Sequence, residues 1–158
     1  MAHTAVDVMA PGDWYAAMIA AVMDASQVII GTYMYDNDSL TDALEQRLCD
    51  RSEFELVMLL DRECYEKKTP PSQRPRLERL RRANAEIVVC RGTPSTGSFH
   101  TKAVVIDRKL AFVGSANVTN KSLRNSELCF RMRGPPVLDI IQLLVRERAR
   151  GQVLQRCV

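Results

Sequence analysis

The chain has 158 residues, enough for one domain with a buried core, and 46% hydrophobic with 26% charged residues is typical of a soluble globular protein. The net charge of +3 is compatible with an anionic ligand but excludes a dense coat of positive charge. The longest apolar run, residues 16–23, is too short to cross a bilayer, and no targeting segment is evident at the N-terminus, so we expect no transmembrane segment and a cytoplasmic location.

Helical and strand patterns alternate through the first half of the chain. Pro11, Gly12 and Asp13 open a predicted helix. Its apolar residues recur on one face, at Trp14, Met18, Ala21, Val22 and Ala25. A short strand at residues 28–34, a turn with capping residues at 36–39 and a helix at 40–49 follow. Residues 54–60 are almost wholly apolar, as expected of a strand covered on both faces.

The second half continues the alternation. We expect a polar surface loop at 63–75, a basic helix at 76–83, a strand at 87–90 and a loop at 92–97 that borders the site described next. A further strand at 128–132 and a helix from Pro135 to about Arg148 complete the pattern. Together these elements predict a single α/β domain, residues 1–158 with a core of about 13–148, built as an α/β/α sandwich around a mixed sheet.

Polar residues cluster around one predicted hairpin. On a strand that runs through residue 106, His100 and Lys102 share a face and Asp107 falls on the other, so Asp107 has a structural or orienting role. A second strand at 110–113 follows a turn. If Arg108 and Lys109 alone form that turn, Ala111 lies opposite Ile106, Ser115 opposite Lys102 and Asn117 opposite His100; a longer loop shifts this register.

These residue types suit phosphodiester chemistry. A neutral imidazole at His100 can attack phosphorus, while Lys102 and Asn117 hold the non-bridging oxygens. Glu127 can accept a hydrogen bond from the other ring nitrogen of His100, and Gly114 leaves room for a phosphate near the backbone. A His-x-Lys pair alone is usually a solvated strand and Gly-Ser-x-Asn alone is usually a turn. The two together, across one hairpin, are much more specific.

Cysteine usage gives no metal or disulfide signal. The five cysteines, an odd number without a C-x-x-C pair, are Cys49, Cys64, Cys90, Cys129 and Cys157. They fit buried free thiols in a reducing compartment better than a zinc site or a disulfide framework.

The spacing His-x-Lys, four residues, Asp, six residues, Gly-Ser-x-Asn resembles the signature of the phospholipase D superfamily. The matching positions are His100, Lys102, Asp107, Gly114, Ser115 and Asn117, and residues 125–127 resemble the downstream acidic element of the family. The resemblance covers roughly residues 13–148. It implies a phospholipase D-like fold and a catalytic set of His100, Lys102, Asp107, Ser115, Asn117 and Glu127, with Gly114 at the substrate and no metal or other cofactor.

The chain carries one copy of a motif that the family uses twice per active site. Short single-motif members, among them small bacterial endonucleases and the Zucchini/mitochondrial cardiolipin hydrolase group, solve this by homodimerising. The resemblance therefore implies a homodimer in which one His100 is the nucleophile and the other the general acid.

The substrate class stays open at this stage. Basic residues on and before the helix at 76–83 either track a nucleic-acid backbone or form a solvated face; they are Arg74, Arg76, Arg79, Arg81 and Arg82. Tyr33, Tyr35 and Phe99 either stack bases or belong to the core. The apolar C-terminal helix is deeply packed, at a dimer interface or, as a minority view, lipid-facing. A nuclease acting on DNA or RNA ranks first, a phospholipase D-like lipid (cardiolipin) hydrolase second, and an inactive dimeric nucleic-acid-binding module third.

Overall fold

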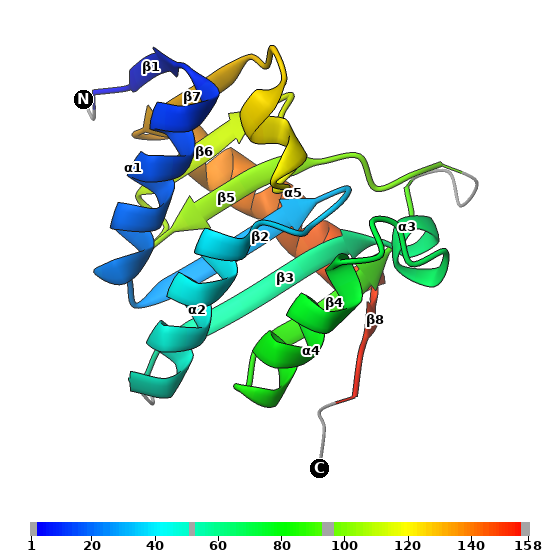
Figure 1. Ribbon diagram of the computed structural model, residues 1–158. Helices are drawn as coiled ribbons and strands as arrows, with labels where there is room; N and C mark the ends of the chain where they lie inside the picture. Colours follow the sequence, from blue (N-terminus) through cyan, green and yellow to red (C-terminus); the bar gives the residue numbers. More distant parts are fainter. Residues whose placement is uncertain (1–2, 51–52, 93–96, 156–158) are drawn as a thin grey trace.

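The computed structural model describes residues 3–50, 53–92 and 97–155. Within them the chain forms an eight-stranded mixed sheet with helices on both faces, which confirms the predicted α/β/α architecture (Figure 1). The strands are β1 (Ala5–Met9), β2 (Gln27–Thr32), β3 (Glu55–Asp61), β4 (Glu86–Cys90), β5 (Lys102–Ile106), β6 (Leu110–Gly114), β7 (Cys129–Arg133) and β8 (Gln152–Val153).

Three helices cover one face of the sheet and one covers the other. The first group is α1 (Pro11–Met23), α2 (Asp38–Asp50) and α4 (Gln73–Arg82), and α5 (Pro136–Arg150) crosses the opposite face (Figure 1). Two short helices, α3 (Arg62–Glu66) and the 3-10 helix η1 (Lys121–Arg124), lie in the connections after β3 and before β7.

Strand order and direction bring the ends of distant segments together. The order is β1-β7-β6-β5-β2-β3-β4-β8; β2, β3 and β4 are parallel, and the other pairings are antiparallel. Because β5 runs against β2, Thr32 at the end of β2 lies opposite Lys102 at the start of β5. The carboxyl ends of β2 and β3 therefore meet the segment that carries His100.

The core has two halves, one on each side of the sheet. On the side of α1, Trp14 and Met18 are fully buried at helical spacing, and the indole of Trp14 donates to the Phe130 carbonyl at 2.9 Å. On the side of α5, Ile141 and Leu144 pack with apolar residues of the central strands. Burial on both faces explains why β3 is almost wholly apolar.

Several predicted boundaries are wrong in informative places. The predicted loop at 63–75 contains α3 and the first turn of α4, and β1 and β8 are absent from the prediction. Both strands are at sheet edges and mostly exposed, so they lack a strong burial pattern. The strand expected at His100 begins at Lys102, which leaves His100 on irregular chain before it. The predicted rim loop falls largely on residues 93–96, outside the described residues.

The hairpin turn is longer than the two residues expected. Ile106 pairs with Leu110 and Val105 with Ala111, so the turn runs from Asp107 to Lys109. Asp107 and Arg108 adopt positive φ of 50° and 57°, a conformation that Asp tolerates better than most residues. The expected pairing of Ala111 with Ile106 is therefore wrong by one residue.

Cysteine burial differs from the expectation at one position. Cys64, Cys90 and Cys129 are buried free thiols, whereas Cys49 at the end of α2 is exposed. Cys157 lies outside the described residues.

Candidate active site

His100 lies at the edge of the sheet where β2 ends and β5 begins. Its side chain is exposed, while the neighbouring Phe99 is 3% exposed and anchors the segment in the core beneath α5. Gly31 on β2 allows this approach, because a Cβ there would lie 3.3 Å from the Phe99 ring and 2.7 Å from Leu144. A reactive side chain is thus presented to solvent from a fixed backbone.

The imidazole of His100 has two close neighbours. Its Nδ1 lies 3.0 Å from the Nζ of Lys102, which also donates to the His100 carbonyl at 2.8 Å. The ring of Tyr33 packs beside the imidazole with 4.6 Å between centroids, and the Lys102 ammonium lies 5.5 Å from the same phenol ring. The structure therefore brings the predicted pair His100 and Lys102 together.

The surroundings favour a neutral imidazole. Burial and, second, the positive charge of Lys102 lower the pKa of His100, while Asp61 acts in the opposite direction. Burial also lowers the pKa of Lys102, against the opposing effect of Glu127 and Cys64. Because an imidazole must be unprotonated to attack phosphorus, these shifts favour nucleophilic chemistry at neutral pH.

Ser115 and Glu127 form a pair next to Lys102. The hydroxyl of Ser115 donates to the Glu127 carboxylate and accepts from the backbone N–H of Leu128 at 3.0 Å. Asn125 donates to the other carboxylate oxygen at 3.1 Å. Within the described part of the subunit Glu127 thus engages Ser115 and Asn125, and no hydrogen bond joins it to His100 as the sequence suggested.

Gly114 has a packing role in the sheet. A Cβ at this position would overlap the carbonyl oxygen of Leu128 on the neighbouring chain segment. The side of Gly114 on which a Cβ would lie is therefore filled by protein, and the glycine lets β6 approach β7 closely.

Asn117 is held by its backbone. Its carbonyl accepts from the hydroxyl of Tyr15, and the next residue, Val118, pairs with Tyr35 and donates to Thr32 Oγ1 at 3.2 Å. The side-chain Oδ1 of Asn117 is buried without a hydrogen-bond partner among the described residues. The Asn117 loop therefore returns to the end of β2, beside the segment that presents Tyr33.

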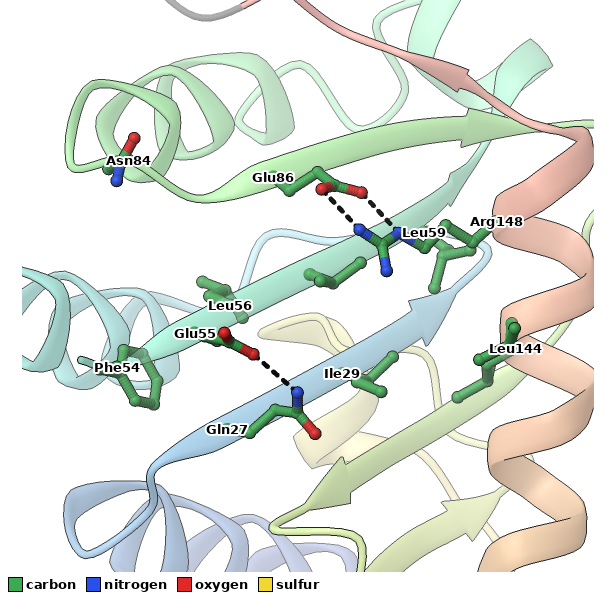
Figure 2. Close-up of a pocket in the computed structure, with 12 residues that line it drawn as sticks. Gln27, Ile29, Phe54, Glu55, Leu56, Leu59, Asn84, Glu86, Leu144 and Arg148 are labelled. Carbon is green, nitrogen blue, oxygen red and sulfur yellow. Dashed lines mark hydrogen bonds and ion pairs between the residues drawn. The ribbon is translucent and has the colours of Figure 1, made fainter.

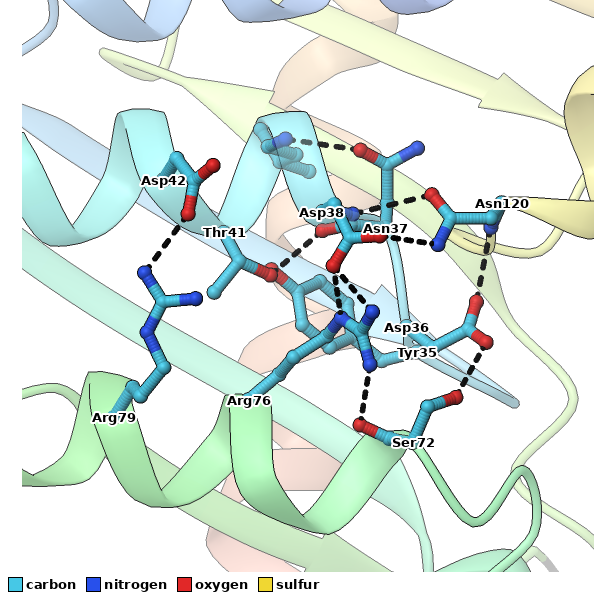
Figure 3. A network of polar contacts seen from close by, with 11 residues as sticks. Tyr35, Asp36, Asn37, Asp38, Thr41, Asp42, Ser72, Arg76, Arg79 and Asn120 are labelled. Carbon is cyan, nitrogen blue, oxygen red and sulfur yellow. Dashed lines mark hydrogen bonds and ion pairs between the residues drawn. The ribbon is translucent and has the colours of Figure 1, made fainter.

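A polar network fixes the chain just beyond Asn117 (Figure 3). Asp36 accepts from the backbone N–H of Asn120 at 2.9 Å and from Ser72 at 2.7 Å, and Asp38 accepts from the Asn120 amide and from Arg76. These bonds join the loop after β6 to the starts of α2 and α4, so three elements position Asn117.

Asp107 is remote from this group. Its Oδ1 accepts the backbone N–H groups of Ser26 and Gln27, each at 2.8 Å, at the opposite end of β5. The carboxylate therefore fastens the β5–β6 turn to the start of β2, which agrees with a structural role and places it outside the group around His100.

Three residues at the site were not singled out from the sequence as catalytic candidates. The neighbouring Cys64 is the main cause that raises the pKa of Tyr33 to about 12. Asp61, at the end of β3, is 2% exposed and accepts from the backbone N–H of Phe99 at 2.8 Å. The sequence signal that could have pointed to Asp61 is an Asp at the end of an apolar strand, because a buried carboxylate needs fixed hydrogen-bond donors. Tyr35 and Phe99, considered for base stacking, are core residues.

The basic stretch on α4 is largely neutralised. Arg76 pairs with Asp38, and Arg79 pairs with Asp42 and Glu45 of α2. The guanidinium of Arg74 stacks on the ring of Tyr65. These contacts favour a helix-to-helix ion-pair network over a continuous track for a polynucleotide.

One cavity is separate from His100. It has a volume of about 410 Å³, lies beside α5 and is bordered by two polar pairs, Gln27 with Glu55 and Glu86 with Arg148 (Figure 2). A smaller cavity of about 220 Å³ is mainly apolar and adjoins the motif, since Lys102 and Gly114 line it together with α5. Among the described residues, no group of three or more His, Cys, Asp or Glu is placed to hold a metal ion, and no helix is long and apolar enough to cross a membrane.

Comparison with known families gives the assignment. The family described as "Cardiolipin synthase, PLD-like domain" matches residues 18–149, which include every position of the His100–Asn117 motif. The chain belongs to the phospholipase D superfamily. No curated protein sequence matches this phospholipase D-like chain.

Solved structures share the fold of this phospholipase D-like chain at low sequence identity. Nuc from Salmonella typhimurium, a phospholipase D family member, matches with a TM-score of 0.79 and 14% identity over 98% of this chain and 99% of its own. NucT from Helicobacter pylori matches with a TM-score of 0.74 and 14% identity, over 98% and 100%. Phosphatidylserine synthase from Haemophilus influenzae Rd KW20 also has a TM-score of 0.74 and 14% identity, over 97% of this chain but 40% of its own.

Proposed function

We propose that the protein is a metal-independent phosphodiesterase that cleaves DNA or RNA backbones through a phosphohistidine intermediate, as a homodimer with a shared active site. Superfamily membership supports a phosphodiesterase-type enzyme at the coarse level. The observation that carries the finer proposal is the contact between His100 and Lys102. An ammonium 3.0 Å from Nδ1 of the imidazole disfavours the imidazolium form, and both groups lie where the chain opens to solvent.

The proposed reaction has two displacements at phosphorus. In the first, the unprotonated ring nitrogen of His100 bonds to phosphorus while the bond to the leaving oxygen breaks, and that oxygen takes a proton from the partner's His100. In the second, the partner's His100 removes a proton from water, which attacks phosphorus and breaks the phosphorus–nitrogen bond. Lys102 and Asn117 stabilise the charge on the non-bridging oxygens in both steps.

Ser115, Glu127 and Asp107 have supporting roles in this proposal. Glu127 fixes the hydroxyl of Ser115 beside Lys102 and offsets part of the positive charge there. Asp107 secures the hairpin from its far end. Ser115, Glu127 and Asp107 are all hydrogen-bonded to neighbouring protein groups. We therefore propose that they act on the position and the electrostatics of His100 and Lys102.

The dimer follows from the chemistry and from one face of the molecule. The described residues contain one imidazole at the site, whereas the first step needs a general acid and the second a general base, each separate from the nucleophile. On the side of α5, Leu138, Leu143 and Val145 are about half exposed, and the apolar cavity between this helix and the sheet continues to Lys102. A second copy covering this apolar face would lie next to the motif, and exposed apolar side chains gathered on one helix favour such an interface.

A nucleic-acid substrate is favoured by the extent of the structural match. The chain covers nearly all of Nuc and NucT but 40% of the phosphatidylserine synthase. A phospholipid such as cardiolipin is the second candidate, because the matching family description names cardiolipin synthase. A binding module without catalysis is disfavoured because it needs no neutral imidazole beside an ammonium.

A substrate panel tests the proposal. The purified protein, in excess chelator, is incubated separately with single-stranded DNA, RNA and cardiolipin vesicles. We expect cleavage of at least one nucleic acid, a fall of about 10⁴-fold or more in the His100→Asn variant, and a covalent phosphohistidine in acid-labile form. The variant His3→Asn, at the other histidine of the chain, is the matched control and should keep full activity.

Three outcomes would contradict the panel's expectation. Cleavage by His100→Asn would exclude His100 as the nucleophile. Activity that is lost in chelator and restored by a divalent cation would exclude a metal-independent mechanism. Hydrolysis of cardiolipin alone would move the substrate to the lipid class.

A further inference from the structure

The carboxylate of Asp61 is buried directly beneath the segment that carries His100. It is 2% exposed, at the last position of β3. Its Oδ1 accepts from the backbone N–H of Cys64 at 3.0 Å and caps α3, and its Oδ2 accepts from the backbone N–H of Phe99 at 2.8 Å. One side chain therefore joins two segments 38 residues apart in the sequence.

The segment at Phe99 has few other backbone restraints. Residues 98–101 lie outside any strand, so they lack the ladder hydrogen bonds that hold Lys102 onward. The ring of Phe99 is buried under α5, which fixes the side chain, and the bond from its N–H to Asp61 fixes the peptide. The next residue along the chain is His100, whose direction follows from that peptide.

We propose that Asp61 is a positioning residue that sets the place and the charge state of the His100 imidazole. The proposal rests on the nucleophilic role of His100 given above, and it adds a residue outside the His-x-Lys motif. A buried carboxylate is costly unless its oxygens accept hydrogen bonds, and Asp61 meets that condition with two backbone donors. The same carboxylate then supplies a fixed negative charge beneath the imidazole.

Several charged groups surround His100, and Asp61 differs from them in being fixed by two backbone bonds. Lys102 on β5 contributes positive charge, and the charge of Glu127, from the segment before β7, acts on that ammonium. Tyr33, just after β2, packs beside the ring, and the Cys64 thiol of α3 raises the pKa of its phenol. Asp61 opposes the effect of burial and of Lys102 on the pKa of His100.

The kinetic test compares Asp61→Asn and Asp61→Ser with Glu63→Gln. In Asp61→Asn, one amide oxygen is left to accept from two donors, the backbone N–H groups of Cys64 and Phe99. In Asp61→Ser, the hydroxyl can still cap α3, but the negative charge and the oxygen that accepts from Phe99 are lost. Glu63 is an exposed carboxylate on the same helix that pairs with Lys67, so its variant removes equal charge without touching Phe99. We expect kcat to fall tenfold or more in both Asp61 variants with KM within threefold, and to stay within twofold in Glu63→Gln.

The pH profile separates positioning from simple destabilisation. Removing a negative charge near His100 disfavours imidazolium, so the pKa of His100 falls. Both limbs of the profile should then move to lower pH, because base and acid are the same residue in two subunits. A lower plateau with unmoved limbs, in a variant with native stability, would overturn the electrostatic part of the proposal.

An NMR titration keeps the test independent of the proposed activity. The chain has two histidines, so the imidazole signals of His100 are assigned by comparison with His100→Asn. We expect the pKa of His100 to fall by about half a unit in Asp61→Ser, and exchange of the Phe99 amide to accelerate at least tenfold. An unchanged His100 pKa with an unchanged Phe99 amide would refute the inference even if no substrate is cleaved, whereas the expected shifts in an inactive protein would reject only the phosphodiesterase function. If Asp61→Asn does not fold, Asp61→Ser carries the comparison, because its cap on α3 is retained.

Discussion

The ammonium of Lys102 has two roles in the proposed reaction. It lies 3.0 Å from the imidazole of His100, and after burial it is the second cause of the low pKa of that ring. In the proposed mechanism, the charge of a phosphoryl group develops beside this ammonium. The same residue would then keep the proposed nucleophile neutral before attack and stabilise the transition state during it.

Replacing Lys102 by Met tests both tasks together. Loss of the positive charge should raise the pKa of His100, because imidazolium is no longer repelled, and the acid limb of kcat/KM should move to higher pH. We also expect kcat/KM at the optimum to fall about a hundredfold or more. A pH–rate profile and a histidine NMR titration measure the two effects. Lys109→Met, at the exposed β5–β6 turn, is the control; equal losses in both variants would contradict a local role.

The sequence predicted the contact between His100 and Lys102 better than the residues that surround it. The two residues were expected together from their spacing, and the structure brings them into contact although His100 lies before β5. Asp61 and Tyr33 reach the same place through the order of strands, with β2 between β5 and β3, and no local pattern contains that information. Glu127 was predicted near the site but its bond to Ser115 depends on how β6 pairs with β7.

At the scale of elements, the close approach of β6 and β7 decides where the motif residues stand. Gly114 ends β6 opposite Cys129. The backbone N–H of the next residue, Ser115, donates to the Leu128 carbonyl, and the Leu128 N–H donates to the Ser115 hydroxyl. There is no room for a side chain at Gly114 because the Leu128 carbonyl occupies it. The pair formed by Ser115 and Glu127 depends on this contact.

The variant Gly114→Ala should therefore separate the two strands. We expect a loss of about 1–3 kcal/mol in the free energy of unfolding, because the added methyl group meets backbone that cannot rotate away. Urea denaturation followed by circular dichroism measures the change. Gly12→Ala is the matched control, since nothing lies within 4 Å of a Cβ there and alanine favours the helix. Equal stability of Gly114→Ala and the parent chain would refute the packing argument.

The elements that sequence patterns predicted are those that a continuous core demands. The predicted strands at 54–60 and 87–90 lie within one or two residues of β3 and β4, because burial on both faces leaves an unbroken apolar run. The β5–β6 turn is one residue longer than predicted, because the residue types Arg108 and Lys109 do not reveal the positive φ values at Asp107 and Arg108. Helix α3 was missed because it is one short turn stabilised by the Asp61 cap rather than by an apolar stripe.

At the scale of the whole molecule, helices cover the two faces of the sheet unequally. Within the described chain, three helices of eight or more residues cover one face of the sheet and α5 alone lies on the other (Figure 1). The exposed apolar residues Leu138, Leu143 and Val145 belong to α5, and the small cavity beside it opens toward Lys102. The unequal cover and the single imidazole at the site lead to the same proposed unit of function, a pair of subunits.

A mixing experiment measures that unit directly. Parent and His100→Asn subunits are refolded together at equal amounts and fixed total concentration, so that both kinds of dimer and the mixed dimer form. If each site needs both His100 residues, only parent dimers turn over, and activity should fall to about one quarter of the parent value rather than about one half. Varying the fraction of parent subunits should then give a quadratic curve. A straight line would mean that each subunit acts alone, and the second imidazole would have no place in the mechanism. Light scattering on the same samples reports the mass, so a linear curve from a dimer is distinguished from a linear curve from a monomer.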